Sequence, residues 1–255
     1  MSKIKIFNSI QDFIVYRGSL NADLNIGLVP TMGALHRGHA SLIARSANEN
    51  DVCVVSIFVN PTQFNNPEDL KKYPHSMEDD IKLAEASGAH IVLAPEFAEI
   101  YPDDYRYKLS ENSFSKALCG AHRPGHFDGV LTVVLKLLLI VTPDKAYFGE
   151  KDFQQLKLIQ DMIKALFLKT DLVPCPTIRE SNGLALSSRN LRLTAEGRKK
   201  ASLLFKALTE YSDSEKAAAF LNSHDIKIEY FEEHFKRRFI AAHVDGVRLI
   251  DNVEI

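Results

Sequence analysis

The feature that most constrains this chain is a series of short apolar runs separated by segments with helical spacing. Three of these runs, at 26–29, 52–58 and 90–94, are rich in Val, Ile and Leu, and the second reads VCVVSIF. Continuous β-branched sequence of this length is typical of a strand that is covered on both faces. Strands that alternate with helices indicate a parallel sheet with right-handed crossovers, so we expect a Rossmann-like, doubly wound α/β fold.

The first run opens the stretch Ile26–His39, IGLVPTMGALHRGH, which predicts a strand, a turn and the start of a helix. Helix N-termini attract anions, because their first N–H groups lack partners within the helix and the helix dipole is positive there. We expect Gly33 and Gly38 to let the backbone approach such a ligand. His36 and His39 fall on one side of the first turn, where imidazoles hydrogen-bond to phosphate oxygens or protonate them. Alone, H-x-G-H is more often a turn that happens to hold two histidines.

Charge and cysteine content argue against several classes of protein. The 255 residues are 45% hydrophobic and 25% charged, as in ordinary globular proteins, and the net charge of −2 argues against a nucleic-acid-binding face. Cys53, Cys119 and Cys175 are far apart and form no C-x-x-C pair, which argues against a disulfide framework and favours a reducing cytoplasm. We expect no secretory signal and no membrane span, because the most apolar run, 130–141, is interrupted by Lys136 and is too short. It predicts a buried helix.

Two further polar segments have the composition of phosphate-binding turns. The segment 149–152, GEKD, follows a predicted strand. Its Lys151 can neutralise a phosphate, and Asp152 either caps the next helix or meets a ribose hydroxyl, although a simple helix cap is the safer interpretation. The segment 186–189, LSSR, offers two hydroxyls and an arginine, but such sequences are common on surfaces. Facing the two histidines, the two segments could hold both ends of a nucleoside triphosphate while its α-phosphate is attacked.

Two glutamines, Gln63 and Gln155, follow predicted strands. Neutral amides suit a small hydroxylated acid whose carboxylate must stay nucleophilic, because a Lys or Arg in their place would stabilise the carboxylate in its ground state. Considered singly, Gln63 is more simply a loop residue and Gln155 a residue of a first helical turn.

Other polar pairs are explained more simply without a ligand. Asp79 and Asp80 could bind Mg²⁺, but in a first helical turn they more simply complement the helix dipole. His122 and His126 are separated by Pro-Gly, so they cannot form a helical metal-binding pair.

The sequence changes character after Pro176, where TIRESNGLALSSRNLRLT is polar and rich in turn formers. We therefore divide the chain into a nucleotide- and acid-binding domain, 1–177, and a smaller α+β lid domain, 178–255. In the second domain we expect helical structure over 194–223 and a hairpin at Asp245-Gly246.

Five motifs, in this order, resemble those of the pantoate–β-alanine ligase family, and the resemblance covers almost the whole chain. They are VPTMGALHRGH (29–39), SIFVNPTQF (56–64), RPGHFDGV (123–130), AYFGEKDFQQL (146–156) and GLALSSRN (183–190). The histidine and SSR motifs alone point only to the wider nucleotidyltransferase superfamily. The glutamine-bearing segments narrow the resemblance to the ligase.

The resemblance implies a two-step reaction in which pantoate attacks the α-phosphate of Mg-ATP and the amine of β-alanine then displaces AMP from pantoyl adenylate. It implies that Gln63 and Gln155 bind pantoate, with Gln63 also near β-alanine, and that the protein is a cytoplasmic homodimer that binds no nucleic acid or membrane. The implied catalytic residues are His39 as proton donor, His36, Lys151 and Arg189. The implied ATP-binding residues are Met32, Gly33, Ala34, Leu35, His36, Arg37, Gly38, His39, Gly149, Glu150, Lys151, Asp152, Ile178, Leu186, Ser187, Ser188 and Arg189.

The chain departs from the family pattern in two places. His75 stands where the family usually has Arg, and the part between Tyr211 and the hairpin is expected to be shorter than is typical.

Two other functions can be weighed against the ligase. A nucleotidyltransferase acting on a phosphate acceptor would favour cations in place of Gln63 and Gln155. A nucleotide-sensing protein without turnover would not need the contacts with the triphosphate that His39, Lys151 and Arg189 can make.

Overall fold

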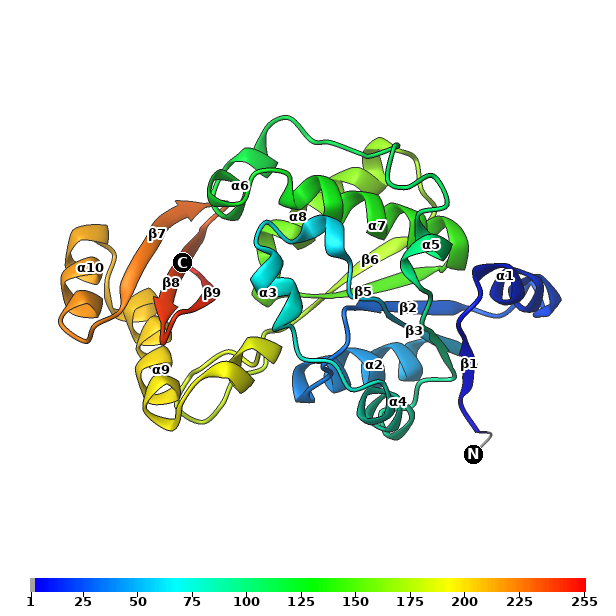
Figure 1. The fold of residues 1–255 in the computed structure, drawn as a ribbon, viewed down its shortest axis with the longest axis horizontal. Coiled ribbons are helices and arrows are strands. Elements are labelled where there is room, and N and C mark those ends of the chain that lie inside the picture. The colour runs from blue at the N-terminus through cyan, green and yellow to red at the C-terminus, as the bar shows by residue number, and fades with distance from the viewer. Residues whose placement is uncertain (1–2) are drawn as a thin grey trace.

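In the computed structural model, which describes residues 3–255, the chain forms two separate β-sheets (Figure 1). The larger sheet has six strands in the order β1-β4-β3-β2-β5-β6, and every neighbouring pair is parallel. The parallel sheet predicted from the alternating pattern is therefore confirmed. Its strands are β1 (Lys5–Phe7), β2 (Ile26–Thr31), β3 (Val52–Ile57), β4 (Ile91–Leu93), β5 (Lys145–Gly149) and β6 (Asp171–Cys175).

Helices cover both faces of this sheet (Figure 1). On β3, the adjacent residues Val54 and Val55 are both buried but belong to apolar clusters on opposite faces, which explains why the strand sequence is apolar without alternation. The helices of one face are α1 (Ile10–Ser19), α7 (His126–Val141) and α8 (Phe153–Ala165), and those of the other are α2 (Arg37–Glu49) and α4 (Met77–Ala86). The predicted buried helix over 130–141 forms most of α7.

The order of the strands reverses between β2 and β5. From β2 the chain adds β3 and then β4 on one side, and it returns to the other side of β2 to add β5 and β6. In open α/β sheets, ligands bind beyond the carboxyl ends of the strands at such a reversal. The histidine-bearing turn follows β2 and the GEKD turn follows β5, so the fold brings these two segments to the same place.

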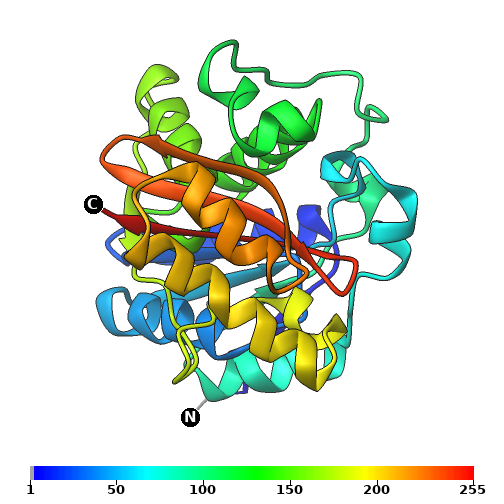
Figure 2. The same ribbon diagram turned by 90° about the vertical axis from the view of Figure 1, so that its left-hand side faces the viewer.

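The second sheet is antiparallel and has the order β7-β8-β9, and the helices α9 (Ala195–Glu210) and α10 (Ser214–Asn222) lie on its outer face (Figure 2). Its strands are β7 (Lys227–His234), β8 (Arg237–Val244) and β9 (Val247–Glu254). The hairpin predicted at Asp245-Gly246 is confirmed, since both residues have positive φ between β8 and β9. A continuous helical segment over 194–223 is wrong, because α9 ends at Glu210 and Asp213 caps a new helix.

The second sheet also packs against the larger body of the chain. Along β8, Ile240 and Ala242 join the apolar cluster formed with α9 and α10, whereas Phe239 and Ala241 join the main cluster that contains α7 and α8. Both faces of β8 are therefore buried. Within residues 3–255, no helix combines the length and the apolar character needed to cross a lipid bilayer.

Short helical turns complete the fold. The segment 59–74, which links β3 to α4, contains η1 (Pro61–Gln63) and α3 (Pro67–Lys71). The other short elements are α5 (Phe97–Ile100), η2 (Phe114–Lys116), α6 (Cys119–His122), η3 (Glu150–Asp152) and η4 (Ser188–Arg192).

Candidate active site

A cleft of about 230 Å³ opens where the strand order reverses. The predicted site residues that line it are Met32, His36, Gly38, His39, Gln63, Gly149, Lys151, Asp152, Gln155, Ile178, Leu186, Ser187, Ser188 and Arg189. Five predicted residues lie outside its wall: Gly33, Ala34, Leu35, Arg37 and Glu150. The fold thus brings the histidine pair, the GEKD turn, the SSR loop and the two glutamines to one cleft.

The two histidines at the start of α2 hold each other in place. His36 is the N-cap, and its Nδ1 accepts a hydrogen bond from the backbone N–H of Gly38 at 3.1 Å. The Nδ1 of His39 accepts one from the backbone N–H of His36 at 3.2 Å, and the ring centroids are 4.1 Å apart. Because each Nδ1 is an acceptor, the proton of each neutral ring is on Nε2. Each ring can therefore donate one hydrogen bond from Nε2 to a ligand.

Burial, as the main cause, lowers the pKa of His36 to about 4 and the pKa of His39 to about 3, and the positive charge of Lys151 contributes to both shifts. Both imidazoles are therefore uncharged near neutral pH. Of the two possibilities given above, hydrogen bonding to phosphate oxygens is favoured over proton transfer from an imidazolium.

The turn before α2 is held by Asp80 of α4. Its carboxylate accepts hydrogen bonds from the backbone N–H groups of Ala34 at 2.9 Å and Leu35 at 2.6 Å. At Gly33, where φ is +77°, a Cβ would come within 2.8 Å of this carboxylate, and a Cβ at Gly38 would meet the ring of His36. A side chain at either position would therefore collide with Asp80 or His36, and Gly38 also lines the cleft.

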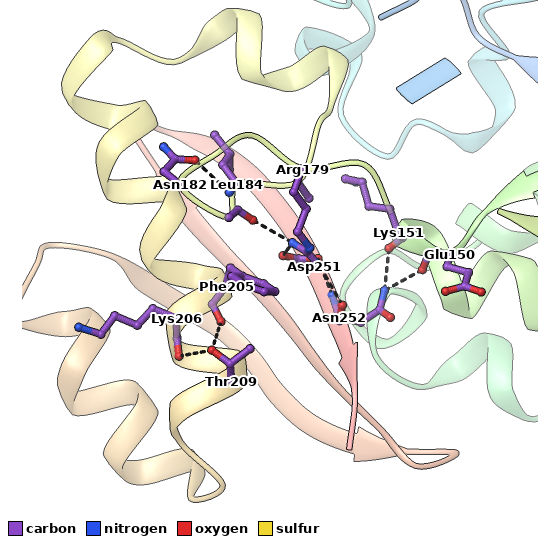
Figure 3. Close-up of polar contacts among 12 residues, drawn as sticks. Glu150, Lys151, Arg179, Asn182, Leu184, Phe205, Lys206, Thr209, Asp251 and Asn252 are labelled. Carbon is purple, nitrogen blue, oxygen red and sulfur yellow. Dashed lines mark hydrogen bonds and ion pairs between the residues drawn. The ribbon is translucent and has the colours of Figure 1, made fainter. Parts of the chain in front are cut away.

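The GEKD turn is anchored from the second sheet. The side-chain amide of Asn252 in β9 donates to the carbonyl oxygens of both Glu150 and Lys151 at 2.9 Å (Figure 3). Glu150 pairs with Arg237 at 3.0 Å, and Lys151 lies 3.7 Å from Asp152. Asp152 occupies the expected N-cap position of α8, but its side chain makes no capping hydrogen bond. Its carboxylate remains at the wall of the cleft.

An ion pair on β9 holds Asn252 in place. Arg179 donates to both carboxylate oxygens of Asp251, at 2.6 and 2.9 Å, and to the carbonyl oxygen of Asn252 at 3.3 Å (Figure 3). The guanidinium lies 4.2 Å from the ring centre of Phe205, and the Asp251 side chain is only 5% exposed. The loop that follows β6 is thereby tied to the strand that holds Lys151.

The SSR loop closes the cleft on the side of the histidines. The hydroxyl of Ser188 donates to the carbonyl oxygen of Ala34 at 3.0 Å, and the hydroxyl of Ser187 accepts from the backbone N–H of Arg189 at 3.3 Å. The guanidinium of Arg189 pairs with Asp69 of α3 at 3.0 Å, and Arg192 pairs with the same carboxylate. Arg189 is thus paired with a carboxylate in this structure, which an incoming triphosphate would have to replace.

Gln63 is oriented by buried neighbours. The side-chain amide of Asn60, which is 1% exposed, donates to the Oε1 of Gln63 at 3.0 Å, and the hydroxyl of Tyr101 donates to Asn60. The Nε2 of Gln63 lies 3.1 Å from the sulfur of Met32. With its oxygen bonded to Asn60 and one N–H directed at the sulfur of Met32, Gln63 keeps its second N–H as a donor for the cleft.

The adjacent glutamines of α8 differ in their roles. Gln154 is buried, and its side chain bonds to the main chain of Phe114, Ala117 and Cys119. Gln155 lines the cleft, and across residues 3–255 no hydrogen bond engages its side chain. Gln155 therefore has free donors and an acceptor for a ligand.

Comparison with known proteins agrees with this geometry. Residues 5–254 match the family described as pantoate-beta-alanine ligase. The chain belongs to the pantoate-beta-alanine ligase family. It is 52% identical over 251 residues to a pantothenate synthetase of Bdellovibrio bacteriovorus, with 98% of this chain and 99% of the relative covered. A pantothenate synthetase of Legionella pneumophila is 48% identical, with 98% of this chain and 99% of the relative covered.

Solved ligase structures share the fold. The pantoate-beta-alanine ligase of Francisella tularensis, crystallised with beta-gamma ATP and beta-alanine, superposes with a TM-score of 0.94 at 42% identity, covering 98% of this chain and 97% of that one. The pantothenate synthetase of Thermus thermophilus gives 0.88 at 36% identity, covering 98% and 99%. The chain is an enzyme that forms pantothenate from pantoate and β-alanine with ATP. These relatives are matched over 97–99% of their own lengths, so this chain is not shortened after Tyr211 when it is compared with them.

The sequence prediction missed two residues of the RPGHFDGV motif in this ligase. His126 is 8% exposed; its Nδ1–H donates to the carbonyl oxygen of Gln63 at 2.9 Å, and its Nε2 accepts from Arg123 at 3.0 Å. Arg123 also donates to the carbonyl oxygen of Gln63 at 3.1 Å. The two side chains fix the main chain of a predicted substrate-binding residue about 60 positions earlier. Their place in a shared motif was the only signal in the sequence.

His75, the departure from the ligase pattern, lies away from the cleft. It lines a separate hollow behind the histidine-bearing turn together with Asp80, and its Nδ1 lies 3.3 Å from the carbonyl oxygen of Tyr73.

Proposed function

We propose that the residues of the cleft form two groups, one that binds ATP and one that binds pantoate. The wall formed by His36, His39, Lys151 and the SSR loop binds the triphosphate of ATP, and Ile178 lies beside the adenine. Lys151 and Arg189 stabilise the charge that develops when the α-phosphate is attacked. The neutral rings of His36 and His39 donate hydrogen bonds to phosphate oxygens from Nε2, which follows from their lowered pKa values.

Gln63, from the turn after β3, and Gln155, from α8, bind pantoate in the same cleft. A carboxylate oxygen of pantoate attacks the α-phosphorus of ATP, the bond from that phosphorus to the bridging oxygen breaks, and pyrophosphate leaves. The amine of β-alanine then attacks the acyl carbon of pantoyl adenylate, AMP leaves, and the amine loses a proton. The observation that carries this proposal is the orientation of Gln63, whose second N–H can hold the acid without placing a full positive charge beside it.

Magnesium enters this reaction as part of the nucleotide substrate. Within residues 3–255, no group of three or more His, Cys, Asp and Glu side chains could hold a metal ion. A Mg²⁺ ion that arrives with a triphosphate keeps water and phosphate oxygens as ligands and needs only one or two carboxylates. Asp152, beside Lys151 at the wall of the cleft, is a carboxylate that fits this requirement.

We also propose the division into a body, 1–177, and a lid, 178–255. The lid residues predicted to bind ATP all lie in its first segment, 178–189, whereas β9 holds the GEKD turn. A homodimer located in the cytoplasm completes the proposal. Sedimentation in the ultracentrifuge tests the dimer, which a monomeric mass at micromolar concentration would refute.

An assay of the two half-reactions tests the assignment of the cleft. With ATP, Mg²⁺ and pantoate alone, the protein should release pyrophosphate for about one turnover and then stop, and AMP should appear only when β-alanine is added. His39→Ala should lose at least about tenfold in adenylate formation with a smaller change in ATP affinity, because a donor that strengthens its bond in the transition state is removed. His224→Ala, at an exposed histidine, is the matched control. Normal turnover in His39→Ala would show that His39 is assigned wrongly.

A further inference from the structure

A small recess of about 60 Å³ adjoins the cleft and is lined by four cationic side chains: Lys151, Arg123, Arg189 and Arg248. Lys151, Arg189 and Gln155 line both spaces, so the recess opens onto the cleft where pantoate and the triphosphate are proposed to meet. Its size suits a small ligand rather than a nucleotide.

One of the four cations lacks an acidic partner. The other three each have one: Arg248 pairs with Glu229, Arg189 with Asp69, and Lys151 with Asp152. Within residues 3–255, no carboxylate lies within 4.0 Å of the guanidinium of Arg123. Two carboxylates, Asp152 and Asp251, also line the recess, but they pair with Lys151 and Arg179. Within the described residues, Arg123 is therefore the cation of the recess without an ion-pair partner.

The hydrogen bonds of Arg123 go only to uncharged groups. It donates to the carbonyl oxygen of Gln63 at 3.1 Å and to the Nε2 of His126 at 3.0 Å, which leaves other N–H donors of the guanidinium unused. Burial and then the positive charge of Arg189 lower the pKa of Arg123 to about 10, so it stays charged at neutral pH in surroundings that disfavour the charge. An anion bound beside it would remove this penalty.

We propose that Arg123 binds the carboxylate of β-alanine and thereby directs its amine toward the acyl group held at Gln63. This inference rests on the proposed function. The carboxylate of pantoate is the nucleophile of the first step, and a neighbouring cation would lower its nucleophilicity. The carboxylate of β-alanine takes no part in bond making, and its charge must be neutralised when it leaves water. A planar guanidinium binds such a carboxylate through two parallel hydrogen bonds. Arg123 is hydrogen-bonded to the main-chain carbonyl oxygen of Gln63. A short amino acid held by Arg123 therefore lies next to the site of acyl transfer.

The test compares β-alanine with its neutral amide, which keeps the amine and lacks the carboxylate. Wild-type protein should prefer β-alanine in kcat/KM by at least about 100-fold, as expected for a charged hydrogen-bonded contact. Arg123→Gln should reduce this preference to less than about tenfold, mainly by raising the KM for β-alanine. Pyrophosphate release from ATP and pantoate alone is measured on the same variant, because Arg123 also bonds to the main chain of Gln63. Any loss in this first step affects β-alanine and its amide equally, since both react with the same adenylate, so it does not change the preference between them. Arg123→Lys, which keeps the charge but not the fork of donors, should give an intermediate preference and serves if the Gln variant does not fold.

Arg248→Gln is the matched control, because Arg248 lines the same recess but is already paired with Glu229. It should keep the wild-type preference for the carboxylate. If Arg123→Gln and wild type discriminate equally, the inference is wrong. If the variant instead weakens inhibition by inorganic pyrophosphate and keeps the preference, the recess binds pyrophosphate and the inference is also wrong. A wild-type protein that forms no pantothenate would refute the proposed function instead, which separates the two failures.

Discussion

Acid should destabilise this protein through a buried histidine that does not face the solvent. His126 is 8% exposed, and burial, followed by the positive charge of Arg123, lowers its pKa from 6.5 to about 3. In the unfolded chain the same ring regains its ordinary pKa. A group whose pKa is depressed in the folded state contributes its full stability above the unfolded pKa and loses it as the pH falls toward the folded pKa. The window for His126 therefore runs from pH 6.5 down to about pH 3.

The size of the effect follows from the two pKa values. Between pH 7.5 and pH 5.5 the unfolded ring becomes mostly protonated, while the folded ring stays neutral. The free energy of unfolding should fall by about 1.4 kcal/mol from this residue alone. His36 and His39 have lowered pKa values and act in the same direction. The pH dependence of the wild-type stability therefore sums several histidines. A variant at His126 is needed to measure the contribution of this residue.

His126→Gln provides this separation, because an amide can still donate to the carbonyl oxygen of Gln63 and accept from Arg123. Urea unfolding followed by circular dichroism at pH 7.5 and 5.5 gives the free energy of unfolding for each protein. The loss on acidification should be smaller by about 1.4 kcal/mol in the variant than in the wild type. His224→Gln, at an exposed histidine, controls for the substitution itself. Equal losses in the wild type and His126→Gln would refute the assignment of a neutral buried ring.

Two further predictions concern carboxylates. Asp69→Asn should lower the KM for ATP by roughly fivefold in steady-state assays, because the triphosphate no longer competes with Asp69 for Arg189; a higher KM would mean that Asp69 instead holds Arg189 ready for the nucleotide. Asp251→Asn should lower the free energy of unfolding by about 2–3 kcal/mol, because it leaves the half-buried guanidinium of Arg179 without its charge partner. Asp225→Asn, which removes an exposed ion pair, should change stability by less than about 1 kcal/mol in the same urea titration.

The parts of the fold that the sequence predicts are those with a local cause. The burial of Val54 and Val55 on opposite faces makes the strand apolar throughout, and positive φ at Asp245 and Gly246 requires turn residues. Strand β7 was missed because its sequence, KIEYFEEH, is rich in charged residues and shows no regular alternation of buried and exposed positions. It is a strand because it pairs with β8 across the second sheet, which no local pattern records.

The residues of the candidate site also fall into those that a local motif predicts and those that only the folded chain brings together. Reactive side chains such as His39, Lys151 and Gln63 could be found from short motifs, because each motif supplies an unusual chemical group next to a predicted turn. The residues that set their state could not be found in this way. Asp80 binds the backbone at Ala34 from 46 positions away, and nothing in its own surroundings distinguishes it from a residue that complements a helix dipole. Its role exists only once α4 packs beside the turn.

The hydrogen-bond partners of Gln63 explain why its side chain meets the acid through a neutral donor. Asn60 fills the acceptor of the Gln63 side chain, and His126 and Arg123 hold its main chain, so the amide cannot turn its oxygen toward a carboxylate without losing a buried hydrogen bond. An amide fixed in this orientation attracts the acid through N–H dipoles, which bind it more weakly than a full charge would. Since an anion that is bound less strongly in its ground state remains a better nucleophile, the buried network favours adenylation without any direct contact with ATP.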